Sequence, residues 1–582
     1  MTAPSDLDIP PPAVRIQSER ASNQTLTTLT AMTPAAVAFC LFLYQVVKFC
    51  KDSKFFVDDP FISMRFAANL VRYGELSFNP GIRVEGYSNL LHVLVHAATF
   101  QLLGRVPDAA TGINGVVAIV FLAALSQLLV LYGLTRSAKR NTTESTAWYY
   151  AWVLTMASLP FAFWAAAGLE TPIEGLLYVA TTLVAVRSKH LTGWPIAVLA
   201  MLLLGVTLLR FEGVLVATAV ASAIAWHSWN EQSRKAAPWM VLAVVLPGTG
   251  YHLFRLWYFG ALLPNTYIAK ATGGSQFGRL NAGVHYCGNW LALLGAGIAV
   301  VAVLVAYLAR NERTLESGEP EQPVLTLSVL IAATFVVSKL VLVTFGGGDW
   351  MPGFRMLVPI TPFAVFLVCK LLLSSSNQAA HVRPQGLAAA CFALAIPLVV
   401  RGVPFNGNGN ESSDTKGLKD IPGSYVEVGR LLKAHFHGQE EVAIGEAGLI
   451  PFEAMDVRFL DMFGLVDADI AHQPGGMHQR VHQVHLVERQ PIAVVFAHLT
   501  TQPPFGPYQY GPELLQSQLF HANYRRVRLD RSLEAFGWAL YVKRNVEVGA
   551  RNLEWSATDS FLASLGQSGA YVDTVPNSTS PN

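Results

Sequence analysis

The stretch VDDPFISMRFAANLVRYGELSFNPGIRVEGYSN, residues 57–89, decides how the chain is interpreted. It follows the first long apolar segment, where most membrane proteins have a plain polar loop. Two adjacent carboxylates, Asp58 and Asp59, precede apolar residues that recur at helical spacing over 61–71, with Arg65 on another face. This pattern predicts a short amphipathic helix that lies in a membrane interface.

The Asp-Asp-Pro sequence has two interpretations. Proline is tolerated in the first turn of a helix, so Asp58, Asp59 and Pro60 can simply mark a helix N-terminus. Alternatively, paired carboxylates beside a helix in the lipid plane, together with several arginines, indicate chemistry on a lipid phosphate. The rest of the chain bears on this choice.

The composition is that of a membrane protein. Of the 582 residues, 52% are hydrophobic and 14% are charged, whereas soluble proteins carry roughly 25% charged residues. The net charge of +2 argues against nucleic acid as a partner. The cysteines are scattered and form no CxxC pair, so we predict neither a zinc site nor a disulfide framework, with a Cys50–Cys287 disulfide as a less favoured alternative.

Residues 31–402 are predicted to form a polytopic α-helical membrane domain with its first polar loop at 51–108. The polar residues 1–30 before it are predicted to be disordered, and its first apolar run is interpreted as an uncleaved anchor. About eleven segments are long and apolar enough to cross a bilayer, and their approximate cores are 32–50, 110–135, 147–165, 172–187, 193–209, 213–229, 238–258, 288–309, 323–345, 354–373 and 386–402.

The orientation depends on residues 90–104, which are apolar but short. If they do not cross the membrane, the short basic loops, such as RSAKR at 136–140, all fall on one side, which is then cytoplasmic. We therefore predict a re-entrant or interfacial helix at 90–104 and a multi-pass protein of the inner or plasma membrane. Its N-terminus is predicted to be cytoplasmic and its C-terminal domain extracytoplasmic.

The loops on the opposite side are rich in Gly, Pro, Asn, Trp and charged residues. A charge at mid-membrane costs roughly 2.5–3.5 kcal/mol, so charges this close to apolar spans call for a reason. We expect these loops to form one site, and they are 57–59 with 83–89, 168–172, 210–213, 259–270 and 346–355.

Residues 403–570 are predicted to form a small α/β domain, followed by a disordered tail at 571–582. Short strands are expected between helical stretches, at 441–444, 457–461 and 492–497, with a later hairpin of 526–529 and 539–542. The sequence Gly445-Glu446-Ala447-Gly448 lacks the P-loop lysine and is interpreted as a tight strand-to-helix turn.

Three histidines, His478, His482 and His485, have the spacing of a helical metal face. The glutamate of an HExxH motif is absent, so a solvated helix is the favoured interpretation. No cofactor is required by the sequence, and a divalent metal ion held by carboxylates stays open.

Several motifs between residues 55 and 500 match a known family. They are DDPFISMRFAANLV…GELSFNPGIRVEGYSN, GLETP, RFEG, ALLPNTYIAK, GGDWMPGFRMLVP and IGEAGLIPF…DMFGLVD. The chain resembles the bacterial GT-C glycosyltransferases related to the mycobacterial terminal β-(1→2)-arabinofuranosyltransferase. It departs from the family pattern at Pro60, Ser88 and Phe211, so the resemblance leaves the sugar and the acceptor open.

The resemblance implies a polyprenyl-phosphate sugar donor and an essential acidic residue in the first outer loop, where Asp58 and Asp59 stand. Carboxylates can deprotonate an acceptor hydroxyl or stabilise positive charge at the anomeric carbon. We expect one of the two to act as base or nucleophile and the other to orient it.

The remaining candidates follow from the needs of such a transfer. Cationic donors, arginine above all, suit the leaving phosphate, and the candidates are Arg65, Arg83, Arg210, Lys270 and Arg355. Amides, carboxylates and aromatic rings suit the sugar or acceptor, and the candidates are Glu85, Asn89, Glu170, Asn265, Asp349, Trp350 and Tyr267. Each has a structural alternative, such as an ion pair, a helix-terminal carboxylate or the aromatic belt.

These features predict an integral membrane glycosyltransferase of GT-C type. It would transfer a sugar, with arabinofuranose among the candidates, from polyprenyl phosphate to a glycan, lipid or protein of the cell envelope. A lipid-linked glycan ligase or transporter is the first alternative, although transporters more often show inverted repeats and charges at the midplane. A non-catalytic envelope scaffold is the second.

Overall fold

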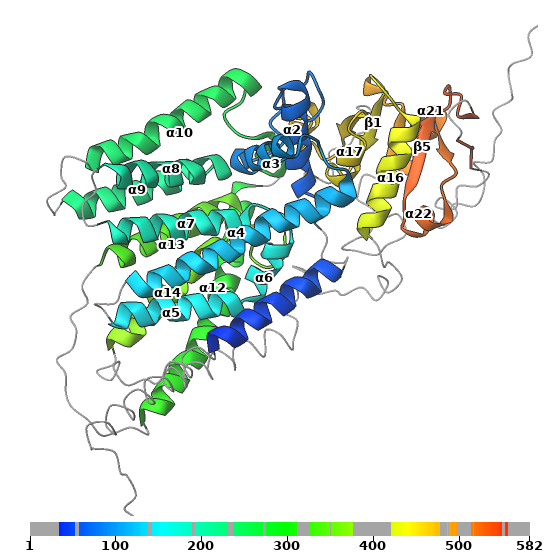
Figure 1. Ribbon diagram of the computed structural model, residues 1–582. Helices are drawn as coiled ribbons and strands as arrows, with labels where there is room; N and C mark the ends of the chain where they lie inside the picture. Colours follow the sequence, from blue (N-terminus) through cyan, green and yellow to red (C-terminus); the bar gives the residue numbers. More distant parts are fainter. Residues whose placement is uncertain are drawn as a thin grey trace, which may run out of the picture.

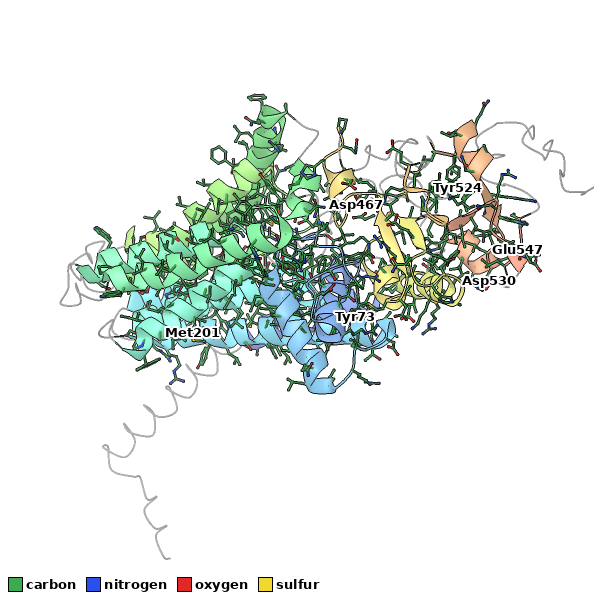
Figure 2. The ribbon with its side chains drawn as sticks, turned by 90° about the horizontal axis from the view of Figure 1, so that it is seen from above. Tyr73, Met201, Asp467, Tyr524, Asp530 and Glu547 are labelled. Atoms are coloured by element: carbon green, nitrogen blue, oxygen red, sulfur yellow. The ribbon has the colours of Figure 1, made fainter. Side chains whose placement is uncertain are left out.

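The protein is an α-helical membrane protein with a C-terminal α/β domain (Figure 1). The computed structural model describes residues 34–52, 57–137, 142–188, 193–229, 237–271, 275–310, 326–349, 351–375, 421–475, 477, 486, 488–497, 514–515, 517–549 and 553–556. Long helices lie side by side, and the α/β domain, residues 421–556, packs at one end of them. Figure 2 shows the same arrangement from above, with Met201 in the helical part and Tyr524 and Glu547 in the α/β domain.

The predicted apolar segments that the structure describes all fall on helices, whereas segment 386–402 lies outside the described residues. The helices are Pro34–Lys51, α4 (Ala109–Ser137), α5 (Thr142–Ala157), α6 (Leu159–Ala166), α7 (Thr171–Arg187), α8 (Trp194–Leu209), α9 (Gly213–Trp229), α10 (Ala237–Phe259), α12 (Gln276–Arg310), α13 (Leu327–Gly346) and α14 (Thr361–Ser375).

The predicted span 147–165 is wrong as a single helix. The chain breaks at Ser158, whose side chain caps α6 by accepting from the backbone N–H of Phe161. Helices α6 and α7 then form a pair bent by 115°. Between them, Gly168 has a φ of +81°, in the left-handed region that favours glycine. This break places the loop that carries Glu170 at the end of the bundle.

Length and composition single out a smaller set of helices as membrane spans. Within the described residues, three helices are long and apolar enough to cross a membrane, namely Pro34–Lys51, Ala109–Ser137 and Leu327–Gly346. The bent pair of α6 and α7 makes a fourth if it is one span. Helix α3 (Leu90–Leu103) is apolar but has 14 residues, fewer than the roughly 20 that a crossing needs.

Helix α2 (Pro60–Tyr73) lies between the bundle and the α/β domain and is covered by protein, whereas a helix that lies in a membrane interface was predicted to expose its faces to lipid and water. All of its residues from Pro60 to Asn69 are buried. A hydrophobic core joins α2 and α3 to the α/β domain, in which Phe452 packs against Phe61 with ring centroids 5.9 Å apart. The α/β domain covers Arg65 on the polar face of this helix, whereas Arg72 at its end stays exposed.

The α/β domain contains a five-stranded sheet in the order β2-β1-β3-β5-β4. Strand β1 (Glu441–Ile444) lies between β2 (Arg458–Asp461) and β3 (Ala493–Phe496) and is parallel to both. Strand β5 (Ala539–Lys543) is antiparallel to β3 and to β4 (Tyr524–Val527). The hairpin pair is confirmed, but β4 begins two residues earlier than we predicted.

Short helices connect the strands of the sheet and pack around it. Helix α16 (Ile421–His435) precedes β1, α17 (Leu449–Glu453) follows it, and the others are α18 (Ala468–Ala471), α21 (Gln518–Asn523) and α22 (Arg531–Ala535). The turn 445–448 joins β1 to α17, which confirms its interpretation as a strand-to-helix turn. This turn meets the loop that carries Asp58.

Candidate functional site

Asp58 attaches the first polar loop to the α/β domain. Its two carboxylate oxygens accept hydrogen bonds from the backbone N–H groups of Gly448, at 2.9 Å, and Leu449, at 2.7 Å. Burial and the nearby charge of Glu446 raise the pKa of Asp58 well above its usual value, and the two N–H donors oppose this rise. Both oxygens of Asp58 are therefore held by the backbone at the start of α17.

Gly448 leaves no room for a side chain at this contact. A Cβ atom on Gly448 would lie 2.2 Å from the backbone oxygen of Asp58 and 2.4 Å from its carboxylate carbon. We expect Gly448→Ala to lower the free energy of unfolding by about 1–3 kcal/mol, the usual cost of overpacking. Thermal unfolding in detergent measures this. Gly549→Ala is the matched control, because a Cβ there meets nothing within 4 Å, and equal midpoints for the two variants would contradict the prediction.

Asp59 differs from its neighbour. It stands at the N-cap of α2 without a side-chain capping bond, and no hydrogen bond within the described residues engages its carboxylate. Burial raises the pKa of Asp59, and the charges of Lys270 and Arg355 oppose this rise, while Asp349 and Glu446 add to it. The sequence does not distinguish the roles of Asp58 and Asp59, whereas their hydrogen bonds in the structure do.

The cations near Asp59 come from two different loops. Lys270 lies on α11 (Asn265–Ala271) with its side chain exposed. Arg355 follows α13 and donates from Nε to the Asp349 carboxylate at 2.6 Å, and its guanidinium carbon lies 5.9 Å from the Trp164 ring centroid. The charge of Asp349 raises the pKa of Arg355 against the effect of burial.

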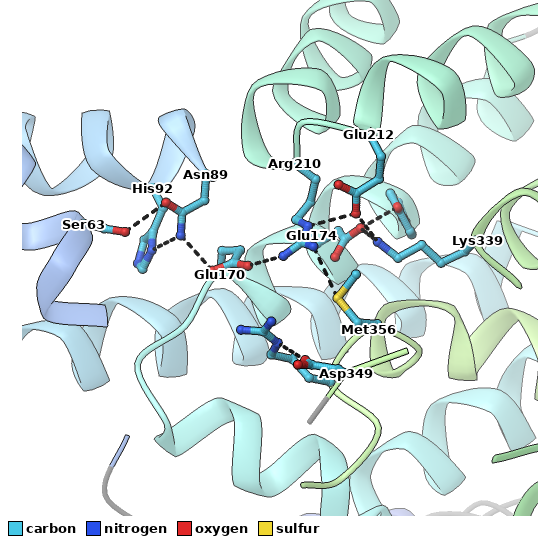
Figure 3. Close-up of polar contacts among 12 residues, drawn as sticks. Ser63, Asn89, His92, Glu170, Glu174, Arg210, Glu212, Lys339, Asp349 and Met356 are labelled. Carbon is cyan, nitrogen blue, oxygen red and sulfur yellow. Dashed lines mark hydrogen bonds and ion pairs between the residues drawn. The ribbon is translucent and has the colours of Figure 1, made fainter. Parts of the chain in front are cut away.

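A chain of polar contacts joins three of the other predicted loops (Figure 3). Asn89 donates to Glu170 at 2.9 Å and accepts from Ser63 at 2.9 Å. Glu170 in turn accepts from Arg210 at 2.9 Å. Arg210 also donates to Glu212 at 3.0 Å. The loops therefore meet, as expected. The side chains that we predicted to bind sugar or phosphate form hydrogen bonds with one another.

These polar contacts continue into the membrane helices through residues that the sequence analysis did not single out. Lys339 of α13 lies 2.6 Å from Glu174 of α7 and 3.6 Å from Glu212. Tyr178 donates to the same Glu174 oxygen at 2.7 Å. Lys339 stands inside an apolar helix, and a charged residue in such a segment is itself a signal of a buried partner.

Two predicted sugar ligands instead hold structural elements together. The Glu85 carboxylate accepts from Arg255 at 2.7 Å and from Tyr251 at 3.1 Å. The Asn265 backbone N–H donates to the Glu85 carbonyl at 2.9 Å, and its side chain donates to the carbonyls of Gly464 and Leu465. These contacts fasten α10 and α11 to the first loop and to the α/β domain.

Arg65, a predicted phosphate ligand, is engaged by backbone carbonyls instead. Its side chain is fully buried and donates to backbone carbonyls, among them those of Phe78 and Val457, both at 2.9 Å, and that of Pro451. A guanidinium so occupied serves as a link between α2 and the α/β domain. Arg83, by contrast, is exposed and stacks over the Tyr258 ring at 4.7 Å.

The remaining candidates are placed less closely. Tyr267 packs its ring 5.0 Å from that of Phe211. Trp350 lies outside the described residues, as do His478, His482 and His485 of the alternative metal face. In the part of the chain that the structure describes, no group of three or more His, Cys, Asp or Glu residues is arranged to hold a metal ion.

Comparisons with known proteins give two kinds of match. A family model described as a domain of unknown function (DUF8728) matches residues 418–549, which include most of the α/β domain. No curated protein matches the chain in sequence. Among solved structures, the chain is similar to ArnT from Cupriavidus metallidurans bound to undecaprenyl phosphate, with 11% identity, a TM-score of 0.49, and coverage of 88% of this chain and 97% of that one.

The same bacterial protein in its apo state is similar to a comparable extent. The identity is 10%, the TM-score is 0.47, and the match covers 89% of this chain and 98% of that one. These similarities assign no activity to particular residues.

Proposed function

We propose that this protein is an integral membrane glycosyltransferase that takes a sugar from a polyprenyl-phosphate donor and transfers it to an acceptor of the cell envelope. The observation that carries the proposal is the position of Asp59, near the cations Lys270 and Arg355, where the membrane helices meet the α/β domain. A transfer of this kind needs a base for the acceptor, cations for the phosphate and apolar helices for the lipid. This junction offers all three.

The proposed reaction assigns one role to each side of the site. The acceptor hydroxyl loses its proton to the Asp59 carboxylate while its oxygen forms a bond to the anomeric carbon. The bond from that carbon to the phosphate oxygen breaks, and the electron pair leaves with the phosphate. Arg355 and Lys270 stabilise the negative charge on the leaving group. Asp58 holds the loop that presents Asp59.

The finer features are also proposals. We infer that the sugar is a pentofuranose, because the motifs resemble those of arabinofuranosyltransferases. We infer that the site lies on the extracytoplasmic face, because the basic loops all fall on the opposite side when 90–104 does not cross the membrane. On that face a lipid-linked donor replaces the nucleotide sugars of the cytoplasm.

A transporter is the main alternative, and the buried pair of Lys339 and Glu174 bears on it. Lys339 is seven residues from the end of α13, which corresponds to about 10 Å along the helix. Glu212 also connects it to Arg210 at the end of the bundle. The pair therefore extends the polar network of the site and does not form a separate midplane site.

The direct test uses membranes that contain the protein, radiolabelled polyprenyl-phosphate sugars, arabinofuranose among them, and envelope extract as acceptor. Transfer of label into the extract by the wild type is the expected result. Absence of transfer from every donor, with the protein inserted and folded, would remove the proposal. A scaffold or transporter would then be favoured.

The cations provide a sharper prediction. We expect Arg355→Gln and Lys270→Gln each to raise the donor KM about tenfold or more, since a hydrogen bond to a charged group is worth about 1.5–3 kcal/mol. Arg105→Gln is the matched control, because it removes the same charge from an exposed residue. Arg105 precedes α4, and the backbone N–H of Ala109, the first residue of α4, donates to Glu453 of the α/β domain. An equal change in all three variants would indicate a general effect of charge and would contradict phosphate binding.

A further inference from the structure

The α/β domain brings a third carboxylate to the site. Glu446 is separated from β1 by Gly445 alone and is 8% exposed. It stands two residues before Gly448, whose backbone N–H donates to the Asp58 carboxylate at 2.9 Å. A Cβ atom on Gly448 would overlap Asp58, so the turn and the loop are in direct contact. The position of Glu446 relative to the loop is therefore set by two backbone hydrogen bonds and close packing.

The sheet topology marks the same place. The chain leaves β1 toward β2 on one side, and then crosses to β3 on the other side of β1. In sheets of parallel strands, ligands bind outside the carboxyl ends of the strands where the connections diverge in this way. Glu446 stands at the carboxyl end of β1, at this divergence.

The charge of Glu446 affects the pKa of both Asp58 and Asp59. Behind the effect of burial, it raises the pKa of Asp58 and contributes to the raised pKa of Asp59. It also contributes to the raised pKa of Tyr425 on α16. Asp58, Asp59, Tyr425 and Glu446 therefore lie within electrostatic range of one another, with the cations Lys270 and Arg355 contributed by the membrane-helix part and Glu446 by the α/β domain.

We propose that Glu446 positions the acceptor, by accepting a hydrogen bond from an acceptor hydroxyl next to the one that reacts. This inference rests on the proposed function and extends it, because it makes the α/β domain part of the transfer site. The donor phosphate is placed at the cations, so the acceptor enters from the side of the α/β domain. A carboxylate is a strong acceptor for sugar hydroxyls.

The pH dependence separates this role from a structural one. The charged groups that act on Asp59 are Lys270 on α11, Arg355 and Asp349 after α13, Glu446, and the adjacent Asp58, whose own pKa is raised by the charge of Asp59. Replacing Glu446 by Gln removes one negative charge, so the pKa of Asp59 falls. A base with a lower pKa stays deprotonated to lower pH, and the acidic limb of the activity profile should therefore move to lower pH.

The experiment compares wild type, Glu446→Gln, Glu446→Asp and a matched control in membranes, with donor and acceptor varied separately. We expect Glu446→Gln to raise the acceptor KM about tenfold or more, to leave the donor KM within about twofold, and to shift the acidic limb to lower pH. Glu446→Asp should recover part of the acceptor KM and the wild-type pH profile. Glu427→Gln is the control, because it removes the same charge from an exposed position on α16.

The outcomes are distinct. An active Glu446→Gln enzyme with a wild-type acceptor KM and pH profile would overturn the inference and leave the proposed function standing. The inference would also be overturned if Glu446→Gln lost thermal stability while Glu446→Asp had the same donor KM and the same acceptor KM as the wild type. Absence of transfer by the wild type itself would show that the proposed function has failed.

Discussion

Asp59→Asn should lower the rate of sugar transfer by about 10²–10⁴-fold, the usual contribution of a positioned general base, without unfolding the protein. The substitution keeps the size of the side chain and removes its ability to take a proton. Because no hydrogen bond within the described residues engages this carboxylate, and it does not cap α2, its loss should cost little stability. Radiolabel transfer and thermal unfolding of the same membrane preparation measure the two effects.

Asp58→Asn is the informative comparison, since it makes the same chemical change one residue earlier. The N–H groups of Gly448 and Leu449 donate to different oxygens of Asp58, and an asparagine would turn an NH2 donor toward one of them. We expect a lower thermal midpoint and a smaller, indirect loss of activity. If Asp58→Asn abolished transfer at full stability while Asp59→Asn remained active, the assignment of roles would be reversed.

The wild-type pH profile tests the same assignment. Burial raises the pKa of Asp59, as do Asp349 and Glu446, and Lys270 and Arg355 only partly oppose this. As the pH falls, Asp59 therefore takes up its proton at a higher pH than an exposed aspartate, and activity through the deprotonated form is lost there. A kcat/KM profile whose acidic limb lies at the usual pKa of an aspartate would contradict Asp59 as the base.

Lys339→Met should lower the free energy of unfolding by about 3–5 kcal/mol, the cost of breaking a buried ion pair from one side. Lys339 is 1% exposed and is paired with Glu174 at 2.6 Å and Glu212 at 3.6 Å. Without its ammonium group, Glu174 keeps only the Tyr178 hydroxyl among the partners described here. A carboxylate left in this position must be protonated or hydrated, and either costs stability.

A second substitution tests the cause. In Lys339→Met/Glu174→Gln the unpaired charge is gone, so we expect recovery of a large part of the lost stability, measured as the thermal midpoint in detergent. Lys51→Met is the control, because Lys51 is exposed at the end of the helix Pro34–Lys51. A double variant that is less stable than Lys339→Met alone would show that packing, and not the buried charge, explains the effect.

Much of the fold followed from the sequence because it depends on local pattern. Apolar length predicted the described membrane helices, although it missed the break at Ser158, where a cap and a proline divide one apolar run into two helices. Alternation of residue types predicted the strands at 441–444 and 539–542. The conjunction of Asp58 and Asp59 with the polar loops of one side predicted that these loops would meet.

The roles of individual side chains depended on contacts between distant segments. Asp58 is separated from Gly448 by 390 positions, and no local pattern distinguishes it from Asp59. Arg65 had the same appearance as a phosphate ligand until its guanidinium proved to be held by the carbonyls at the end of α17. Lys339 stood in an apolar segment with no visible partner.

The physical reason is the same in each case. Helix and strand formation depend on the periodicity of hydrophobicity within a few turns, which the sequence contains directly. The state of a buried polar group depends on which donors and charges surround it, and those come from wherever the chain folds back. The sequence by itself determined most of the helices, the sheet strands and the acidic loop. Only the tertiary structure decided which acid is held by the backbone and which has no hydrogen bond to its carboxylate within the described residues.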